Sequence, residues 1–341
     1  MTDVARPTLL RGSACVLLAI GSAAVVGAIM LPTYVEHRLA VTPLDIRTTT
    51  VAVTDPGTGG DVLDATSITR PGPLSVATGV PLVVQRFITT EDPSDADRVT
   101  FQSGATVRRA DREGDAGLLT ASVDRVTVDR RTSQPVDPVA SLQTTVGKPA
   151  IPVPRTGYQQ RFPFDTQPIT YSVYDATAWT SFPAEFVEEI SMDGLPIYHF
   201  RTQVTGADLS ETTQSPINSV TLPASKWGLE GLGEQSITMK RYYSTVRDIY
   251  VEPRSGSLVG GREQPYQYFA RDPAVPEVTV FKATLGLDED GQKEQLDRAR
   301  ESATKLMWLT DRGPVLLWSV GGVGLVLGAA LLVVSGRRSQ R

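Results

Sequence analysis

The chain has little of the chemistry on which most enzymes and metal proteins depend. Its 341 residues include only one cysteine, Cys15, which excludes a disulfide framework and a cysteine-rich metal site. There are two histidines, His37 and His199. No P-loop, dinucleotide fingerprint, G-x-S-x-G nucleophile motif or metal-ligand spacing occurs. We therefore expect no enzyme activity, no catalytic residue, no metal and no cofactor.

Two long runs lack charged residues altogether. Residues 12–35 and residues 313–336 each form an uncharged run of 24 residues. A helix of that length spans about 36 Å, against about 30 Å for the hydrocarbon core of a bilayer. Each run is therefore predicted to be a transmembrane helix. No small-residue cleavage site follows the first run, so we expect a retained anchor there rather than a cleaved signal peptide.

The charges around these runs predict an orientation. Five arginines flank them: Arg6, Arg11, Arg337, Arg338 and Arg341. The positive-inside tendency places the tails 1–11 and 337–341 in the cytoplasm, and the segment 36–312 on the outer side of the plasma membrane. This outer segment has a net charge of about −9, because those five arginines and one aspartate lie in the tails. An acidic segment of this kind argues against nucleic acid as a partner.

The outer segment is predicted to be mainly β structure. The chain's 29 glycines and 24 prolines favour many turns and short strands. Strand patterns occur at 48–54, 81–90, 117–130, 193–204, 246–264 and 276–285. The fold class is thus mainly β (α+β): an extracytoplasmic, elongated β-barrel-like domain with a C-terminal helix, flanked by two transmembrane helices.

The C-terminal helix of this domain is predicted at about 288–312. Apolar side chains fall on one stripe of that helix: Leu296, Ala299, Ala303, Leu306 and Met307. The stripe indicates packing against the sheet, and the alternative is a lid over a cavity.

Aromatic residues concentrate in one part of the chain, around "RFPFDTQPITYSVYDATAWTSFP" at 161–183. Such side chains either build the core or line an apolar cavity. Seven are candidates for lining a lipid cavity: Phe162, Phe164, Tyr171, Tyr174, Trp179, Tyr198 and Phe200. Asp165 and Asp175 could form a sugar-cleaving pair, but their neighbours favour turn chemistry.

Three phrases carry a resemblance to a known family. "RFPFDTQPITYSVYDAT", "DGLPIYHF" and "RDIYVEPRSGSLVGGREQ" occur in this order between the apolar runs. They resemble an actinobacterial family of formerly unknown function, often labelled porin PorA-like, over most of the chain. The matching residues are Phe162, Phe164, Asp165, Tyr171, Tyr174 and Asp175, then Asp193, Gly194, Tyr198 and Phe200, then Tyr250, Glu252, Pro253 and Gly256. The resemblance implies a barrel-like outer domain whose central cavity holds a phospholipid or a related glycolipid. It implies no catalytic residue.

The function expected from the sequence is that of a membrane-anchored lipid-binding or lipid-carrier protein of the cell envelope. The resemblance adds a link to lipoglycan (lipomannan and lipoarabinomannan) synthesis, with phospholipid or glycolipid, the plasma membrane and lipoglycan-synthesis enzymes as partners. One alternative is an envelope scaffold that binds a membrane enzyme or cell-wall glycan. Another is a porin-like subunit. The outer segment carries about 65 charges and lacks the outward apolar band of a spanning barrel, so a pore built from one copy is not expected.

Overall fold

The structure is a computed structural model that describes the backbone of residues 5–145, 147–213 and 215–339. The ends of both predicted cytoplasmic tails lie outside these residues. The chain divides into two compact units. The first, here the helical unit, comprises Met1–Val41 and Glu301–Arg341; the second, the β unit, comprises Thr42–Arg300.

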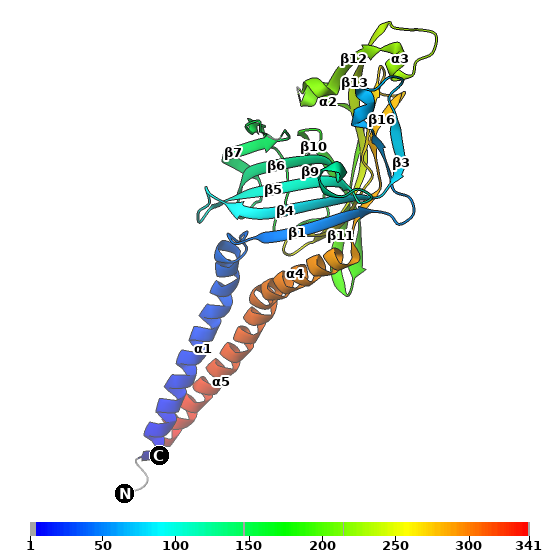
Figure 1. Ribbon diagram of the computed structural model, residues 1–341. Coiled ribbons are helices and arrows are strands. Elements are labelled where there is room, and N and C mark those ends of the chain that lie inside the picture. Colours follow the sequence, from blue (N-terminus) through cyan, green and yellow to red (C-terminus); the bar gives the residue numbers. More distant parts are fainter. Residues whose placement is uncertain (1–4, 146, 214, 340–341) are drawn as a thin grey trace. The chain divides into compact units, whose positions relative to one another are not determined.

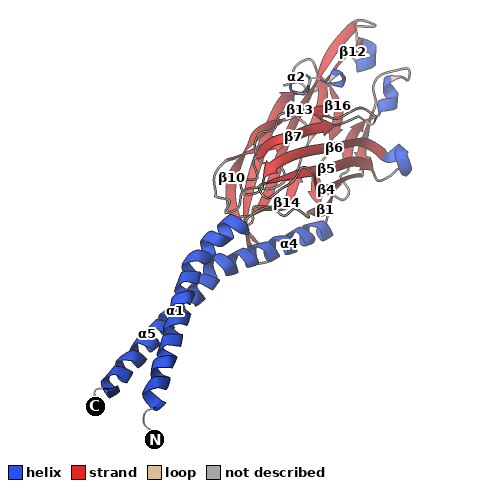
Figure 2. Cartoon of the chain, turned by 90° about the vertical axis from the view of Figure 1, so that its left-hand side faces the viewer, coloured by secondary structure: helices blue, strands red, loops and turns tan. Residues whose placement is uncertain are grey.

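The helical unit consists mainly of two long helices that lie side by side and run antiparallel (Figures 1 and 2). Helix α1 spans Ala5–Arg38 and helix α5 spans Gly313–Ser339. Their outward side chains are apolar, as Ile20 and Val323 illustrate at 54% and 60% exposure. Both helices are long and apolar enough to cross a membrane.

Glycines allow the two helices to approach each other closely. A Cβ atom on Gly21 would lie 2.9 Å from the backbone nitrogen of Leu325, and one on Gly324 would lie 3.2 Å from the Cα of Gly21. A Cβ on Gly328 would lie 2.7 Å from Cγ of Leu18. Small residues at this spacing let helix backbones pack by van der Waals contact where lipid offers no hydrophobic driving force.

The β unit is built on one extended antiparallel sheet of 17 strands. Its first strands are β1 (Arg47–Thr54), β2 (Gly60–Leu63), β3 (Val76–Val80), β4 (Leu82–Glu91), β5 (Arg98–Arg109), β6 (Leu118–Asp129), β7 (Pro135–Gln143), β8 (Ile151–Pro152) and β9 (Tyr171–Asp175). The others are β10 (Thr180–Met192), β11 (Leu195–Asp208), β12 (Ser219–Pro223), β13 (Ser236–Glu252), β14 (Ser257–Glu263), β15 (Tyr266–Ala270), β16 (Val278–Lys282) and β17 (Leu285–Leu287).

The main path of the sheet runs β8–β7–β6–β5–β4–β1–β17–β14–β13–β11–β10–β9. A branch of β15, β16, β2 and β3 leaves β13, and β12 also pairs with β13. In Figure 1, β4, β5 and β6 run across the view while β13 and β3 run nearly upright. The sheet therefore turns through a large angle between its two ends.

The two ends of this path approach each other without closing a barrel. In the part of the chain that the structure describes, no ladder joins β7 to β9. The intervening chain bridges them: the Val153 N–H donates to the Ala140 carbonyl at 3.0 Å, and the Tyr158 N–H donates to the Ser172 carbonyl at 2.8 Å. The predicted barrel-like, mainly β domain is thus confirmed, as an open sheet.

Strand β13 is central because its 17 residues pair with four other strands. On one side it meets β12 and then β11, and on the other it meets β15 and then β14. Its sequence "SITMKRYYSTVRDIYVE" is rich in β-branched and aromatic residues, which suit a pleated, half-buried surface. The hairpin between β10 and β11 turns at Asp193 and Gly194, whose φ angles of 49° and 78° fit a tight two-residue turn.

The remaining elements are short, apart from one helix. The short ones are η1 (Ala65–Ile68), η2 (Gly114–Gly117), α2 (Leu209–Thr212), η3 (Pro216–Asn218), α3 (Ala224–Trp227) and the π-helical turn η4 (Trp308–Arg312). Helix α4 spans Glu289–Met307, which confirms the predicted C-terminal helix. Arg300 of α4 donates to the Asp193 carbonyl at 2.9 Å, and Leu296 and Ala299 of the predicted stripe are buried. These contacts are those of a helix packed on the sheet.

The glycine contacts predict that substitutions at two neighbouring positions of α5 change the stability of the helix pair to different extents. A side chain at Gly321 would place its Cβ 2.7 Å from Cγ2 of Val25, whereas a Cβ at Gly322 meets nothing within 4 Å. We expect Gly321→Leu to destabilise the helix pair by about 1–3 kcal/mol, as overpacking does. Gly322→Leu is the matched control and should leave stability unchanged. The midpoint of a dodecyl sulfate titration, followed by tryptophan fluorescence, measures both. Equal midpoints for the two variants would contradict this packing.

Candidate functional site

The aromatic residues predicted from the sequence form two groups and one isolated stack. Four of the seven candidates belong to a single cluster with neighbouring rings; the cluster contains Phe162, Tyr171, Tyr198 and Phe200, together with Tyr158 and Phe186. Phe162 and Phe200 are almost fully buried, at 2% and 0% exposure, with ring centroids 5.1 Å apart. These two rings therefore pack against protein and build core.

The other three candidates lie elsewhere. Tyr174 is buried and packs with Leu142, Val153 and the partly buried Trp179. Phe164 is half-buried beneath the guanidinium of Arg161, whose Cζ lies 3.8 Å from the ring centroid. Which aromatic residues would touch a ligand stays a prediction.

The three phrases that carry the family resemblance meet in space. The Phe162 N–H donates to the Gly256 carbonyl at 2.9 Å, and the Thr166 N–H donates to the Pro253 carbonyl at 2.8 Å. A Cβ on Gly256 would lie 2.2 Å from the Phe162 carbonyl oxygen, so only glycine fits there. Phe200 then packs on Phe162 from the second phrase. The phrases are therefore mainly a structural joint of the β unit.

A charged cluster that the sequence reasoning missed lies on one face of the sheet. Strand alternation places Arg86 (β4), Asp124 (β6), Arg247 (β13) and Glu263 (β14) on this same face, which we call the inner face. Strands β10 and β11 separate β9 from β13, about 14 Å along a flat sheet. Asp175 at the end of β9 nevertheless lies 3.0 Å from Arg247 of β13, so the inner face is concave.

Arg247 is the best-connected member of this cluster. Its Nη2 lies 3.0 Å from Oδ2 of Asp175 and 2.7 Å from Oε1 of Glu263. The hydroxyl of Tyr243 donates to the same two carboxylates at 3.1 and 3.2 Å. Burial alone would lower the pKa of Arg247, but Glu263, Asp175 and Tyr243 outweigh it and hold the pKa well above its usual value. Burial alone would raise the pKa of Glu263, but Arg247 chiefly lowers it.

Asp175 shows how the predicted turn chemistry and the cluster combine. Its Oδ1 accepts from the backbone N–H groups of Thr177 and Ala178 at 2.8 and 3.0 Å, which confirms a turn role. Its Oδ2 faces Arg247, and the residue is only 2% exposed. Asp165, by contrast, is exposed in a loop and accepts from the side chain of Gln167. Asp175 is thus fully occupied as a structural carboxylate.

A second ion pair completes the inner face. Arg155 and Gln159 both donate to the carboxylate of Asp124, and the Cζ of Arg155 stacks 4.1 Å from the ring centroid of Tyr174. Burial raises the pKa of Asp124 despite the nearby cations, and burial likewise raises the pKa of Tyr174. Donors are in excess here: Nε and Nη1 of Arg155 and the hydroxyl of Tyr174 are buried without a hydrogen-bond partner.

Arg86 differs from every other charge in the cluster. Its side chain is exposed, and among the described residues no ion pair or hydrogen bond involves its guanidinium. Burial lowers its pKa, Arg247 lowers it further, and Glu263, Asp124 and Asp175 oppose this. Arg86 thus presents a water-accessible cation on the concave side of the sheet, which we call the hollow. The sequence feature that could have identified Arg86 is that it is the single charged residue in the apolar-rich run "PLVVQRFITT".

The histidine of the β unit is paired with a carboxylate on the face opposite the inner face. Nε2 of the strand residue His199 lies 2.7 Å from Oδ1 of Asp248, which also accepts from Arg201. Across the described residues, no group of three or more His, Cys, Asp or Glu side chains could hold a metal ion.

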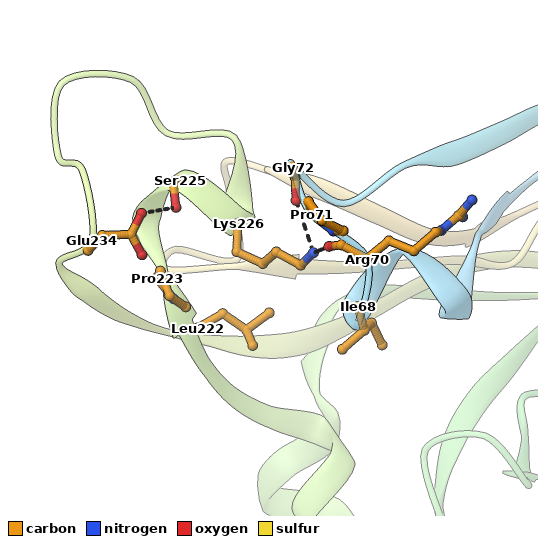
Figure 3. A pocket seen from close by; sticks show the side chains of 9 residues that line it. All are labelled: Ile68, Arg70, Pro71, Gly72, Leu222, Pro223, Ser225, Lys226 and Glu234. Carbon is orange, nitrogen blue, oxygen red and sulfur yellow. Dashed lines mark hydrogen bonds between the residues drawn. The ribbon is translucent and has the colours of Figure 1, made fainter.

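Figure 3 shows an open surface groove of about 570 Å³ beside η1 and α3. There Lys226 donates to the carbonyls of Arg70 and Gly72, and Ser225 donates to Glu234 at 2.8 Å. Because these groups satisfy one another, the groove is a weaker candidate site than the inner face.

Comparisons with known proteins agree with the resemblance in the sequence. A family model described as Porin PorA matches residues 13–330. A protein named Porin PorA from Corynebacterium amycolatum is 31% identical over 373 aligned residues, covering 91% of this chain and 95% of the relative. Another protein named Porin PorA, from Corynebacterium resistens, is 30% identical over 403 aligned residues, covering 95% and 96%.

The Arg247 ion cluster predicts unequal costs for two arginine substitutions on neighbouring strands. Arg247→Gln leaves the buried Asp175 and the partly buried Glu263 without their shared cation, and it should destabilise the β unit by about 3–5 kcal/mol. Arg262→Gln is the control, because Arg262 pairs with Asp55 at 47% and 33% side-chain exposure. A solvent-exposed pair of this kind contributes about 0–1 kcal/mol. Guanidinium unfolding followed by near-ultraviolet circular dichroism compares the two, and similar losses would refute the assigned role.

Proposed function

Because the chain belongs to the porin PorA family, whose members are membrane proteins of the cell envelope, we propose that it holds an amphiphilic lipid or glycolipid within its β unit. The observation that carries this proposal is the mixed character of the inner face. Water-accessible Arg86 lies on the same face as half-buried Val84 and Ile88 of its own strand and Leu287 of β17. A hollow that is charged in one part and apolar in another suits a ligand with a head and a tail.

The physical need for such a hollow comes from the aqueous space outside a membrane. Exposing an acyl chain to water costs about 0.8 kcal/mol for each CH₂ group, so an unshielded lipid does not leave the bilayer. A binding domain anchored beside the bilayer shields the chain while it is held or passed on. By holding lipid in this way, the chain would support lipoglycan synthesis or lipid transfer in the envelope.

The anchoring that we propose uses both long helices. Helices α1 and α5 would cross the plasma membrane, with the ends near Arg11 and Arg337 in the cytoplasm by the positive-inside tendency. The acidic β unit would then lie on the outer side, where a lipid or glycolipid of the envelope is within reach.

A pore is the second candidate, and the name of the relatives favours it. A strand-built pore needs an outward apolar band. On β11, β13 and β14 the face opposite the inner face carries Arg201, Asp248 and Arg262 instead. A pore would therefore have to be lined by helices from several copies. Stepwise conductance of the purified full chain in planar bilayers would favour a pore, whereas its absence alongside bound lipid would favour the carrier.

The carrier proposal predicts that filling the hollow expels the ligand. Ala105 of β5 lies opposite Arg86 in the ladder, and Thr106 points to the other face. The full chain, purified in mild detergent, should retain lipid that mass spectrometry of extracts identifies. Ala105→Trp should lower the retained amount by at least about fivefold through steric exclusion. Thr106→Trp, which adds the same ring to the same strand, should retain lipid as the natural chain does.

Two results would overturn the proposal. The first is a natural chain that carries no lipid and takes none from vesicles. The second is a stoichiometric protein partner in place of lipid, which would identify the chain as an envelope scaffold.

A further inference from the structure

We propose that Arg86 recognises an anionic group, a phosphate or carboxylate, on the amphiphile that occupies the hollow. This inference rests on the proposed function and narrows its ligand class to anionic lipids and glycolipids. Two observations carry it: Arg86 makes no direct ion pair or hydrogen bond with the described residues, and the inner face has a surplus of hydrogen-bond donors.

The carboxylates near Arg86 are already committed to other partners. Asp175 and Glu263 pair with Arg247, at 3.0 and 2.7 Å from its Nη2. Asp124 accepts from both Arg155 and Gln159. Arg247 takes the nearest oxygens of two of these carboxylates and Arg155 those of the third, so among the described residues none of them makes a direct ion pair or hydrogen bond with Arg86, and its guanidinium donors stay open to another acceptor.

The donors of the inner face also lack acceptors. Besides the unpaired groups of Arg155 and Tyr174, the hydroxyl of Thr202 is buried without a partner, and Thr202 lies opposite Arg247 in the β11–β13 ladder. Buried polar groups in native proteins are nearly always satisfied by protein, water or ligand. An acceptor-rich anion complements such a surface, whereas a cationic or purely apolar head does not.

The chemistry of the guanidinium agrees with this assignment. Arginine presents five N–H donors in a planar fork that matches phosphate and carboxylate geometry, and it keeps its charge in a partly desolvated site. Such charge-assisted bonds are stronger than neutral ones. Arg86 makes no direct ion pair or hydrogen bond with the described residues, and it acts on Glu263 and Asp124 only through longer-range attraction. We therefore expect its replacement to change ligand choice more than stability.

The test uses the full chain in detergent and two lipids with identical dioleoyl chains, phosphatidylglycerol and phosphatidylcholine. The natural chain should prefer the anionic lipid by at least about tenfold, the equivalent of one charge-assisted hydrogen bond. Arg86→Gln should remove this preference with its melting temperature kept, and Arg86→Lys should keep part of it. Arg47→Gln is the control, because Arg47 stacks on Phe87 on the opposite face, 5.5 Å from that ring centroid.

Each outcome separates the inference from the function on which it rests. Equal binding of both lipids, or a preference that survives Arg86→Gln, would overturn the anion assignment and leave the carrier function standing. Binding of inorganic phosphate that depends on Arg86, without any binding of lipid, would keep the anion site and overturn the carrier. Competition by phosphate against bound phosphatidylglycerol would place both at one site. Failure to bind either lipid or phosphate would overturn both proposals.

Discussion

The arrangement of the β unit depends most on the ion pairs of the partly buried guanidinium of Arg247. This guanidinium joins β13 to Glu263 of β14 and to Asp175, which ends β9 and also caps the turn toward β10. Buried charges are tolerated only when paired, so these three elements must keep their positions together. A one-residue shift in the register of β13 would move Arg247 to the opposite face and leave Asp175 and Glu263 without their cation.

Because Arg247 uses the carboxylates nearest to it, Arg86 is left without a partner on the same concave face. Arg86 balances the charge of the two carboxylates that share Arg247, but its exposed guanidinium makes one part of the concave face polar. Half-buried aliphatic side chains such as Val84 and Leu287 give the same face an apolar part. The same ion pairs that hold the strands together therefore leave this face with both a charged part and an apolar part.

The aromatic composition of the phrases suggested the lining of a lipid cavity, but two of the aromatic side chains are enclosed in the core. Phe162 and Phe200 are enclosed, and the backbone of the first phrase is hydrogen-bonded to the turn at Pro253–Gly256. That joint holds the C-terminal end of β13, the strand that carries Arg247. The residues that made the chain recognisable thus belong to the packing that positions the charged inner face.

Local pattern determined much of this protein. The two apolar runs determined α1 and α5, alternation located β4, β11 and β13, and the helix-forming segment before the second run determined α4, because burial periodicity and chain flexibility act over short distances. Only the tertiary structure decided which charges meet. Arg247 and Asp175 lie 72 residues apart, and Arg86 reaches their cluster only because the sheet curves. Strand pairing and curvature depend on contacts distant in the chain, so no local pattern contains them.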